Sequence, residues 1–252
     1  MTEGGRGLTV MAANLWHDWP RQRRWAPRLQ AVADLAVHYR VDILLLQEVA
    51  RTRSIALDEW LAQALGMNRT YARANGSARA IGFEEGLAIL SRYPVRDPSV
   101  KRLSRSRLLP RIALAAALDT PLGTVQAVSV HLGLIPRRNA SQLRVLRSWI
   151  GQACQGRVVI IGGDFNAPPT RRDIGYLRHE WTDAFHHMHG DLASSTHRRR
   201  RGRPRDRIID YVFLQQPSGS SWVVADAAHV DGPAGPHSDH RAVIAHVVPA
   251  EA

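Results

Sequence analysis

Short apolar runs that end in a polar or ionisable side chain constrain the fold of this chain more than any other feature of its sequence. Residues 41–49 (VDILLLQEV) are apolar on both faces of an extended segment and carry Glu48 near their end, a pattern typical of a strand that is buried on both sides. The same reasoning predicts further strands at residues 8–13, 86–91, 111–119, 124–130, 158–161, 208–214, 222–225 and 242–248. Residues 120–123 (TPLG) predict a hairpin turn between two of them.

Helical patterns are fewer. Apolar residues recur at helical spacing from Pro27 to Val37, residues 55–65 predict a second helix that Gly66 ends, and residues 136–150 predict a third. Strands therefore outnumber helices, which favours an α+β sandwich. Because no long stretch resembles a linker, we expect a single domain over residues 1–252 with its core at about residues 8–248.

Composition excludes several classes of protein. A hydrophobic fraction of 44% excludes general disorder, and the single cysteine, Cys154, excludes an intrachain disulfide framework and a cysteine-based zinc module. No apolar run approaches the ~20 residues of a membrane helix, and the first residues (MTEGGR) lack the pattern of a signal peptide. We expect a soluble, cytoplasmic protein without stable membrane insertion.

The chain is strongly basic. Its formal net charge is +12 and its pI is about 11.2, and because Lys101 is the only lysine, nearly all of the positive charge is arginine. An arginine excess has two interpretations, a GC-rich genome or phosphate recognition by the planar guanidinium. Charge by itself does not separate a nucleic acid partner, an anionic lipid and no polyanion at all.

The densest part of this charge is the run at residues 197–207 (HRRRRGRPRDR). Most charge runs of this kind are solvated loops. This run, however, leads directly into the strand that carries Asp210, and three extended residues span at most ~11 Å, so Arg207 must lie near Asp210. We therefore predict that the run contacts a polyanionic substrate, nucleic acid, with Arg205 and Arg207 as candidate binding residues.

Polar residues at the strand ends form the candidate site. They are Asn14, Glu48, His131, Asp164 and Asp210, together with the Ser238-Asp239-His240 segment before the final strand. Because the strand ends of one sheet system lie close in space, these side chains can converge. Each one alone has a structural explanation, such as a turn-forming asparagine or a satisfied histidine, but the joint pattern points to a site. The cluster of His186, His187 and His189 is better explained as a polar loop than as a metal site.

Four sequence blocks in a fixed order carry a resemblance to a known family. The blocks are residues 46–49 (LQEV), 163–167 (GDFNA), 209–213 (IDYVF) and 238–240 (SDH). They resemble the signature of the endonuclease/exonuclease/phosphatase superfamily, which includes pancreatic-type deoxyribonucleases, AP endonucleases, neutral sphingomyelinases and inositol polyphosphate phosphatases. The resemblance implies a four-layer α/β/β/α sandwich with two packed, mostly antiparallel β-sheets, and a divalent-metal site for phosphoester hydrolysis at one sheet edge.

Phosphoester chemistry and this resemblance together suggest a role for each candidate residue. A hard cation held by oxygen ligands neutralises phosphoryl oxygens and stabilises a leaving alkoxide, which makes the Glu48 carboxylate the best anchor for Mg²⁺ or Mn²⁺, with Asn14 and Asp239 completing the metal site. His240 suits a general base because a histidine oriented by a carboxylate can take a proton from water, and the resemblance makes Asp210 its partner. In the family, the residue at Asp164 positions water or protonates the leaving group, and those at Asn166 and His131 donate hydrogen bonds to the phosphate.

Two departures from the family pattern limit the comparison. Pancreatic-type nucleases carry an arginine two residues after the metal-binding glutamate, whereas this chain has Ala50 there, with Arg51 one position further on as a candidate substrate-binding residue. They also place a tyrosine before the glutamate that supports the first histidine. The matching stretch here is residues 83–86 (FEEG), and either Glu84 or Glu85 can pair with His131. The Trp16-His17 pair either lines the pocket or belongs to an exposed loop.

The sequence therefore predicts a divalent-metal-dependent phosphodiesterase that acts on DNA as an endo- or exonuclease. The alternative is a phospholipid phosphodiesterase or a small-molecule or inositol phosphatase of the same superfamily, because the fold does not fix the substrate. A non-enzymatic binding protein is disfavoured, since such a protein has little reason to keep both a metal anchor and a His–Asp pair. We expect a monomer with no protein partner.

Overall fold

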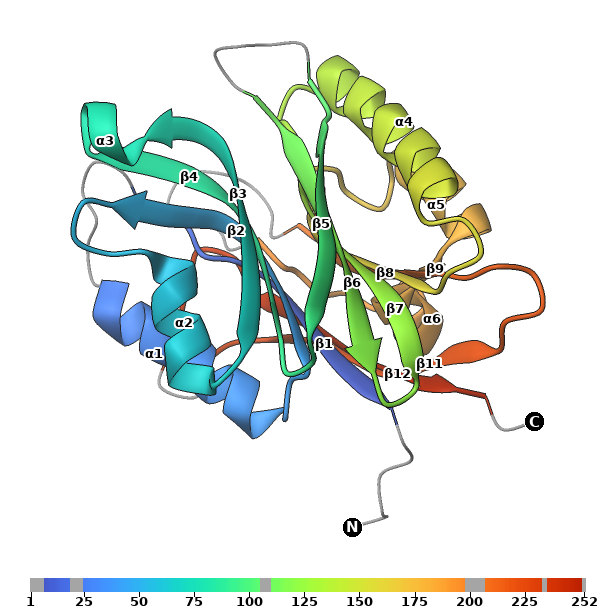
Figure 1. Ribbon diagram of the computed structural model, residues 1–252. Helices are drawn as coiled ribbons and strands as arrows, with labels where there is room; N and C mark the ends of the chain where they lie inside the picture. Colours follow the sequence, from blue (N-terminus) through green and yellow to red (C-terminus); the bar gives the residue numbers. More distant parts are fainter. Residues whose placement is uncertain (1–6, 19–24, 105–109, 198–206, 233–234, 251–252) are drawn as a thin grey trace.

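Two six-stranded β-sheets pack face to face in the computed structural model, with helices on both outer faces (Figure 1). The structure describes residues 7–18, 25–104, 110–197, 207–232 and 235–250. The architecture is the predicted α+β fold, a four-layer α/β/β/α sandwich. Among the described residues, we find no helix that is both long and apolar enough to cross a membrane.

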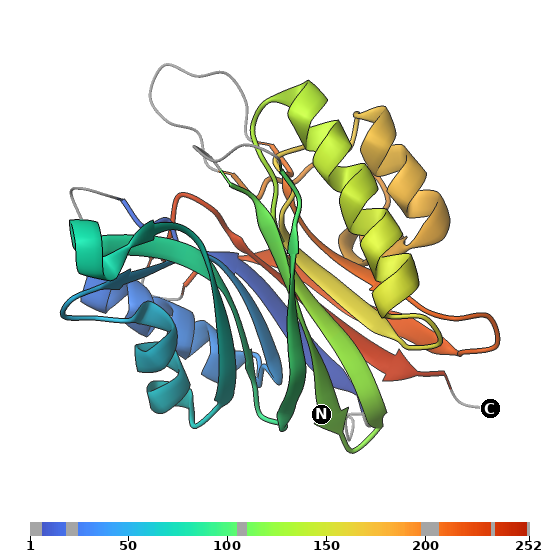
Figure 2. The same ribbon diagram turned by 45° about the horizontal axis from the view of Figure 1, so that its top comes forward.

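The first sheet is built from both ends of the chain. Its strands are β1 (Leu8–Asn14), β2 (Ile43–Thr52), β3 (Asn68–Ser77), β4 (Phe83–Ser91), β11 (Trp222–Val230) and β12 (Ala242–Pro249). They lie in the order β11-β12-β1-β2-β4-β3. Helices α1 (Trp25–His38) and α2 (Leu57–Leu65) cover its outer face in both views (Figures 1 and 2), and the short α3 (Ala78–Ile81) joins β3 to β4.

The second sheet is formed by the middle of the chain. Its strands are β5 (Val95–Arg102), β6 (Ile112–Thr120), β7 (Gly123–His131), β8 (Val159–Asp164), β9 (Thr182–Asp183) and β10 (Asp210–Gln215). They lie in the order β5-β6-β7-β8-β10-β9. Helices α4 (Pro136–Ala153) and α5 (Arg172–Glu180) cover its outer face, and α6 (Ala184–His189) follows β9. In each sheet one pair of neighbouring strands, β1–β2 or β7–β8, is parallel and the other described pairs are antiparallel.

The double-sided burial of the central strands follows from these four layers. In β2, Ile43 and Leu45 face the second sheet and belong to the cluster between the sheets. Leu44 and Leu46 face the opposite way and pack with the helices α1 and α2. Since successive side chains of a strand point to opposite faces, a central strand of this fold is apolar at most positions on both faces, and burial of each large apolar side chain contributes about 1.5–3 kcal/mol.

Three strands that the sequence did not predict, β3, β5 and β9, lie at sheet edges. Most positions of β3 are partly or fully exposed, and so are those of β5, so neither carries an apolar run. The predicted end of the second helix is confirmed, because Gly66 caps α2 in the left-handed conformation with φ +63°, which glycine adopts without strain. The helices α5 and α6 were also not predicted, and His186, His187 and His189 lie on α6 rather than on a polar loop.

Candidate active site

Three of the predicted residues stand side by side in one row of the second sheet. Strand register pairs His131 at the end of β7 with Asp164 at the end of β8, and Asp164 with Asp210 at the start of β10. All three are buried. β7 and β8 are parallel and β10 is antiparallel to β8. The ends of β7 and β8 and the start of β10 therefore lie at the same end of the sheet.

Asn14 joins this row to the first sheet. Its side-chain Nδ2 lies 3.2 Å from Asp164 Oδ2 and 3.3 Å from Glu48 Oε1, and it donates to both carboxylates. Its Oδ1 accepts from the backbone N–H of Trp16 at 2.9 Å. A residue at the end of β1 therefore links the acid on β2 to the acid on β8 across the interface between the two sheets.

The backbone at Glu48 is shaped to present its carboxylate. The pairing of β2 with β4 shifts register between Leu46 and Val49, and Glu48 has a positive φ of +52°, a conformation that costs a non-glycine residue free energy. The preceding side chain, Gln47, is buried and donates from Nε2 to Ser129 Oγ at 3.0 Å on β7. This bulge thus sends Gln47 into the interface between the sheets and Glu48 toward the site.

Glu48 belongs to a cluster that suits a divalent cation. Ligand atoms of His17, Glu48 and Glu85 all lie within 4.8 Å of one another, and His17 Nε2 is 3.1 Å from Glu85 Oε2. Burial acts to lower the pKa of His17, but the hydrogen bond with Glu85 and the charges of Glu48 and Glu85 raise it overall. Burial acts to raise the pKa of Glu85, but His17 and then Arg111 lower it. Two carboxylates and an imidazole form a donor set that fits a divalent metal.

A second cluster holds the predicted proton-transfer groups. Asp210 Oδ2 lies 2.9 Å and Oδ1 3.1 Å from His240 Nδ1, so the predicted His–Asp pair is formed. Burial acts to lower the pKa of His240, but the negative charge and hydrogen bond of Asp210 raise it to about 10. Burial, together with the nearby charge of Asp210, raises the pKa of Asp164 to about 7.

The support of His131 differs from both predicted alternatives. Glu84 accepts from Tyr71 Oη at 3.4 Å. Glu85 lies at the site, but Arg111 stands between it and the histidine, with Nη1 3.9 Å from Glu85 Oε1 and 3.2 Å from His131 Nδ1. The other ring nitrogen of His131, Nε2, is 3.4 Å from Asp164 Oδ2.

The remaining predicted site residues lie on loops beside these clusters. Asn166 has φ +48° and donates from Nδ2 to the Leu132 carbonyl at 2.9 Å, and its backbone N–H donates to Asp164 Oδ1 at 2.8 Å. These bonds hold its loop against the end of β7. Asp239 directly precedes His240, and its Oδ1 accepts a hydrogen bond from Ser238 Oγ at 3.5 Å. Asp239 belongs to neither of the two clusters of potential ligands found among the described residues.

The predicted substrate-binding arginines are placed differently. Arg51 is held by the carboxylate of Asp58, with its Nη2 2.6 Å and Nε 2.9 Å from the two oxygens, and its guanidinium stacks on Tyr71 at 3.8 Å. Arg207 is exposed, and its carbonyl accepts from the backbone N–H of His197 at 2.9 Å. The ring of His197 packs edge-on against His240 at 4.9 Å. The His197 end of the arginine run therefore adjoins His240, and Arg207 pairs with the His197 backbone, whereas Arg205 lies outside the described residues.

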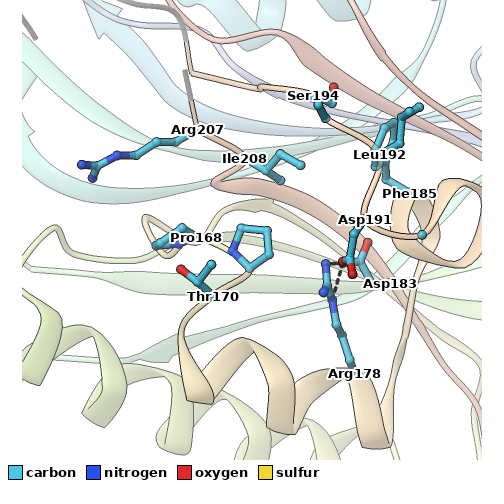
Figure 3. Close-up of a pocket in the computed structure, with 13 residues that line it drawn as sticks. Pro168, Thr170, Arg178, Asp183, Phe185, Asp191, Leu192, Ser194, Arg207 and Ile208 are labelled. Atoms are coloured by element: carbon cyan, nitrogen blue, oxygen red, sulfur yellow. Dashed lines mark hydrogen bonds and ion pairs between the residues drawn. The ribbon is translucent and has the colours of Figure 1, made fainter. Parts of the chain in front are cut away.

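A cavity of about 490 Å³ opens between the segments at residues 168–170, 183–194 and 207–208 (Figure 3). Pro168 and Thr170 lie on one side of it, Arg207 and Ile208 on another, and Phe185 and Leu192 close the far side. Pro168 is two residues after Asn166, and Ile208 is two residues before Asp210. The cavity is large enough for a small organic ligand, and two of its lining residues are near neighbours of predicted site residues in the chain.

Arg111 was not predicted from the sequence as a site residue. Glu85 was predicted as one of two alternative partners of His131, and His17 was predicted either to line the pocket or to belong to an exposed loop. Arg111 has a signal in the sequence, because the hairpin turn at residues 120–123 fixes the register of β6 and β7. That register pairs Ala113 with Val130, which places Arg111 at the level of the residues that follow Val130. The contact of His17 with Glu85 has no such signal, since β1 and β4 are not neighbours in the sheet.

Comparison with known proteins identifies the family. The Endonuclease/Exonuclease/phosphatase family matches residues 11–240, so the chain belongs to that family, whose members hydrolyse phosphoester bonds and generally use a divalent metal. An uncharacterized protein of Escherichia coli K12, YbhP, is 28% identical over 109 residues, which cover 42% of this chain and 40% of the relative. The chain thus matches less than half of that relative's length.

Solved structures share the fold. TDP2 of D. rerio, in complex with a single-strand DNA product, superposes with a TM-score of 0.79 at 15% identity and covers 96% of this chain and 99% of its own. The mannosyl-6-phosphatase Bt3783 of Bacteroides thetaiotaomicron superposes with a TM-score of 0.71 at 19% identity, and the match covers 96% of this chain and 99% of the phosphatase chain. At these identities the likeness concerns the fold alone. The two proteins also differ in substrate, since one was solved with a DNA product and the other is named as a mannosyl-6-phosphatase.

Proposed function

We propose that this protein is a divalent-metal-dependent phosphodiesterase that hydrolyses DNA. The observation that carries the proposal is the bridge made by Asn14, which contacts both Glu48 and Asp164. This bridge places a cation-binding carboxylate and a row of proton-transfer groups within one site. Hydrolysis of a phosphodiester needs both, because charge must be neutralised on the phosphoryl oxygens while a water molecule is activated.

Glu48 is the residue that would anchor the cation, with Glu85 and His17 beside it. An ion bound there would neutralise the phosphoryl oxygens, stabilise the leaving oxygen and, through repulsion, lower the pKa of His240. Asn14 is proposed to complete the metal site by direct contact or through water. Direct contact through Oδ1 requires the amide to rotate, because Oδ1 accepts from Trp16 and Nδ2 faces the carboxylates. Asp239 remains a proposed ligand next to the catalytic histidine.

His240 is the proposed general base. Its Nδ1 faces the Asp210 carboxylate, which only accepts hydrogen bonds, so Nδ1 carries a proton. A bound cation would lower the pKa of His240 and release the proton on Nε2, and Nε2 would then take the proton of the attacking water. The imidazolium that forms is stabilised by the buried carboxylate of Asp210. Asp164, whose pKa lies at about 7, holds a proton often enough near neutral pH to donate it to the leaving oxygen.

Three features support DNA as the substrate. The net charge is +12, which favours a polyanion through counterion release. His197, at one described end of the arginine run, packs against His240, and Arg207 at the other end pairs with the His197 backbone. The same fold in TDP2 has been solved with a single-strand DNA product. The buried pairing of Arg51 with Asp58 leaves the phosphate contacts to the arginine run.

A substrate panel tests this proposal. Supercoiled plasmid, single-stranded DNA, RNA, sphingomyelin liposomes and inositol phosphates are incubated with the protein and Mg²⁺ or Mn²⁺, with EDTA as the metal-free control. We expect nicking or digestion of DNA that His240→Ala abolishes. His246→Ala is the matched control, because His246 lies on β12 and contacts Thr9 instead of the site. Metal-dependent hydrolysis of small phosphodiesters with none of DNA or RNA would overturn the choice of DNA.

The cavity in Figure 3 favours a second candidate, a phosphatase for a small phosphoester. Its volume of about 490 Å³ suits a ligand of sugar or inositol size, and a relative in fold is described as a mannosyl-6-phosphatase. Hydrolysis of inositol or sugar phosphates that exceeds DNA cleavage in the same panel would select this candidate.

A further inference from the structure

Arg111 makes a contact that the proposed mechanism does not use. Its Nη1 lies 3.2 Å from His131 Nδ1 and 3.9 Å from Glu85 Oε1, and its side chain is 18% exposed. Arg111, His131, Glu85 and Glu48 line one narrow crevice. The guanidinium therefore sits inside the site, between the cation-binding cluster and the catalytic row.

The chemistry of the guanidinium determines which ring nitrogen of His131 carries the proton. An arginine side chain only donates hydrogen bonds and keeps its charge at every physiological pH. The atom it contacts, Nδ1, must therefore present a lone pair, so the single proton of the neutral ring is on Nε2. That Nε2–H lies 3.4 Å from Asp164 Oδ2 and faces the catalytic row.

The two histidines of the site are thus in different states. At His240, Nδ1 faces the Asp210 carboxylate, which holds a proton on Nδ1 and raises the pKa of the ring to about 10, so the metal-free protein carries an imidazolium there. At His131, Nδ1 faces a cation, so the ring is neutral and Nε2 is the donor.

The charges around His131 keep it in that state. Burial, followed by the positive charge of Arg111, holds the pKa of His131 well below its ordinary value, and the charges of His240 and His17 act in the same direction. Asp164 on β8 is the acid in contact with the ring, and burial raises its own pKa. His131 therefore remains a neutral donor across the neutral pH range.

We propose that Arg111 is a positioning residue that locks His131 as a neutral Nε2–H donor aimed at the substrate phosphate. The claim that the donor is aimed at a phosphate rests on the proposed function. The assignment of the proton to Nε2 does not rest on it, because that assignment follows from the contacts of the substrate-free protein. If Arg111 acts in this way, the charge and the length of its side chain affect catalysis through His131, although Arg111 itself does not touch the reacting atoms.

The proton of His131 can be read directly by long-range ¹H–¹⁵N NMR on the substrate-free protein, with His131→Gln to assign its signals. In the wild type we expect Nδ1 in the range of an unprotonated ring nitrogen and Nε2 in that of a protonated one. In Arg111→Met, which keeps an unbranched apolar stem and removes the guanidinium, we expect a mixture of tautomers and a pKa of His131 that rises by about 1–2. An Nδ1–H or imidazolium form of the wild type at neutral pH, or a tautomer that Arg111→Met leaves unchanged, would overturn the proposal.

Kinetics provide the second measurement, on whichever phosphoester the wild type hydrolyses. We expect Arg111→Met to lower kcat by about 10- to 100-fold with a small change in KM, because a donor to the transition state loses its orientation, and Arg111→Lys to restore part of the loss. Arg92→Met is the matched control, since Arg92 contacts the Val41 carbonyl away from the site. An unchanged kcat in Arg111→Met contradicts the proposal. A wild type with the Nε2–H tautomer but without phosphoesterase activity contradicts the proposed function alone.

Discussion

Replacing Asp210 by asparagine removes the negative charge that faces His240 and leaves the shape of the side chain nearly unchanged. In the folded wild type the pKa of His240 is about 10, against 6.5 for an ordinary histidine. A pKa that is raised in the folded state contributes stability that is fully present below pH 6.5 and is lost as the pH rises toward 10. Asp164, with a pKa of about 7 against 3.8, adds a loss of the same sign, but at pH values between 3.8 and about 7.

The magnitude follows from the difference of one bound proton. Between the two pKa values the folded protein holds one proton more than the unfolded chain, so the free energy of unfolding falls by about 1.4 kcal/mol for each pH unit. From about pH 7.5 to about pH 9 the metal-free wild type therefore loses about 2 kcal/mol. In Asp210→Asn, burial is opposed only by the charges of Asp164 and Asp239, so the pKa of His240 falls and the slope in this window decreases.

The assay is urea denaturation in EDTA at several pH values, for the wild type, Asp210→Asn and a control. Asp119→Asn is the control, because Asp119 forms an exposed pair with Arg96 and its loss leaves the slope intact. Catalysis by Asp210→Asn is expected to fall about 10³- to 10⁴-fold in kcat, since the proton of His240 is no longer held on Nδ1. If Asp210→Asn shows the same pH slope as the wild type, the assigned role of Asp210 is wrong.

Three further changes test other parts of the site and fold. Glu48→Gln is expected to weaken Mn²⁺ binding by at least about tenfold in calorimetry, and an unchanged affinity would remove Glu48 as the anchor. Asn166→Ala is expected to lower kcat about 100-fold through loss of a donor to the phosphate, whereas Asn68→Ala, whose amide caps the carbonyls of Ser91 and Tyr93, leaves kcat unchanged. Gly163→Ala is expected to lower stability by about 2–4 kcal/mol in thermal unfolding, because Gly163 has φ +146° and an added Cβ would lie 2.0 Å from the Val130 carbonyl oxygen. Gly151→Ala, in α4 with open space around it, stabilises slightly, and equal behaviour of the two variants would refute the reasoning.

Burial explains why some strands could be predicted from the sequence and others could not. Central strands such as β2 are buried on both faces and show continuous apolar runs, so their positions could be predicted to within a few residues. The strands β3 and β5 lie at sheet edges, where much of their surface is exposed. Hydrophobic patterning carries no signal for such strands, because solvent accepts polar side chains on them. The short β9 is held by its pairing with β10 and has no pattern of its own.

The residue types of the site and their places near strand ends could be predicted from the sequence, because the apolar runs and the family blocks are local features. The groups that each of these side chains faces depend on how the strands pack. Asn14 reaches Asp164 across 150 positions of the chain, Arg51 is held by Asp58, and the two histidines face opposite charges, His240 a carboxylate and His131 a guanidinium. These partners come from strands that meet only when the two sheets pack, and the charge that each histidine meets there sets which of its nitrogens holds the proton.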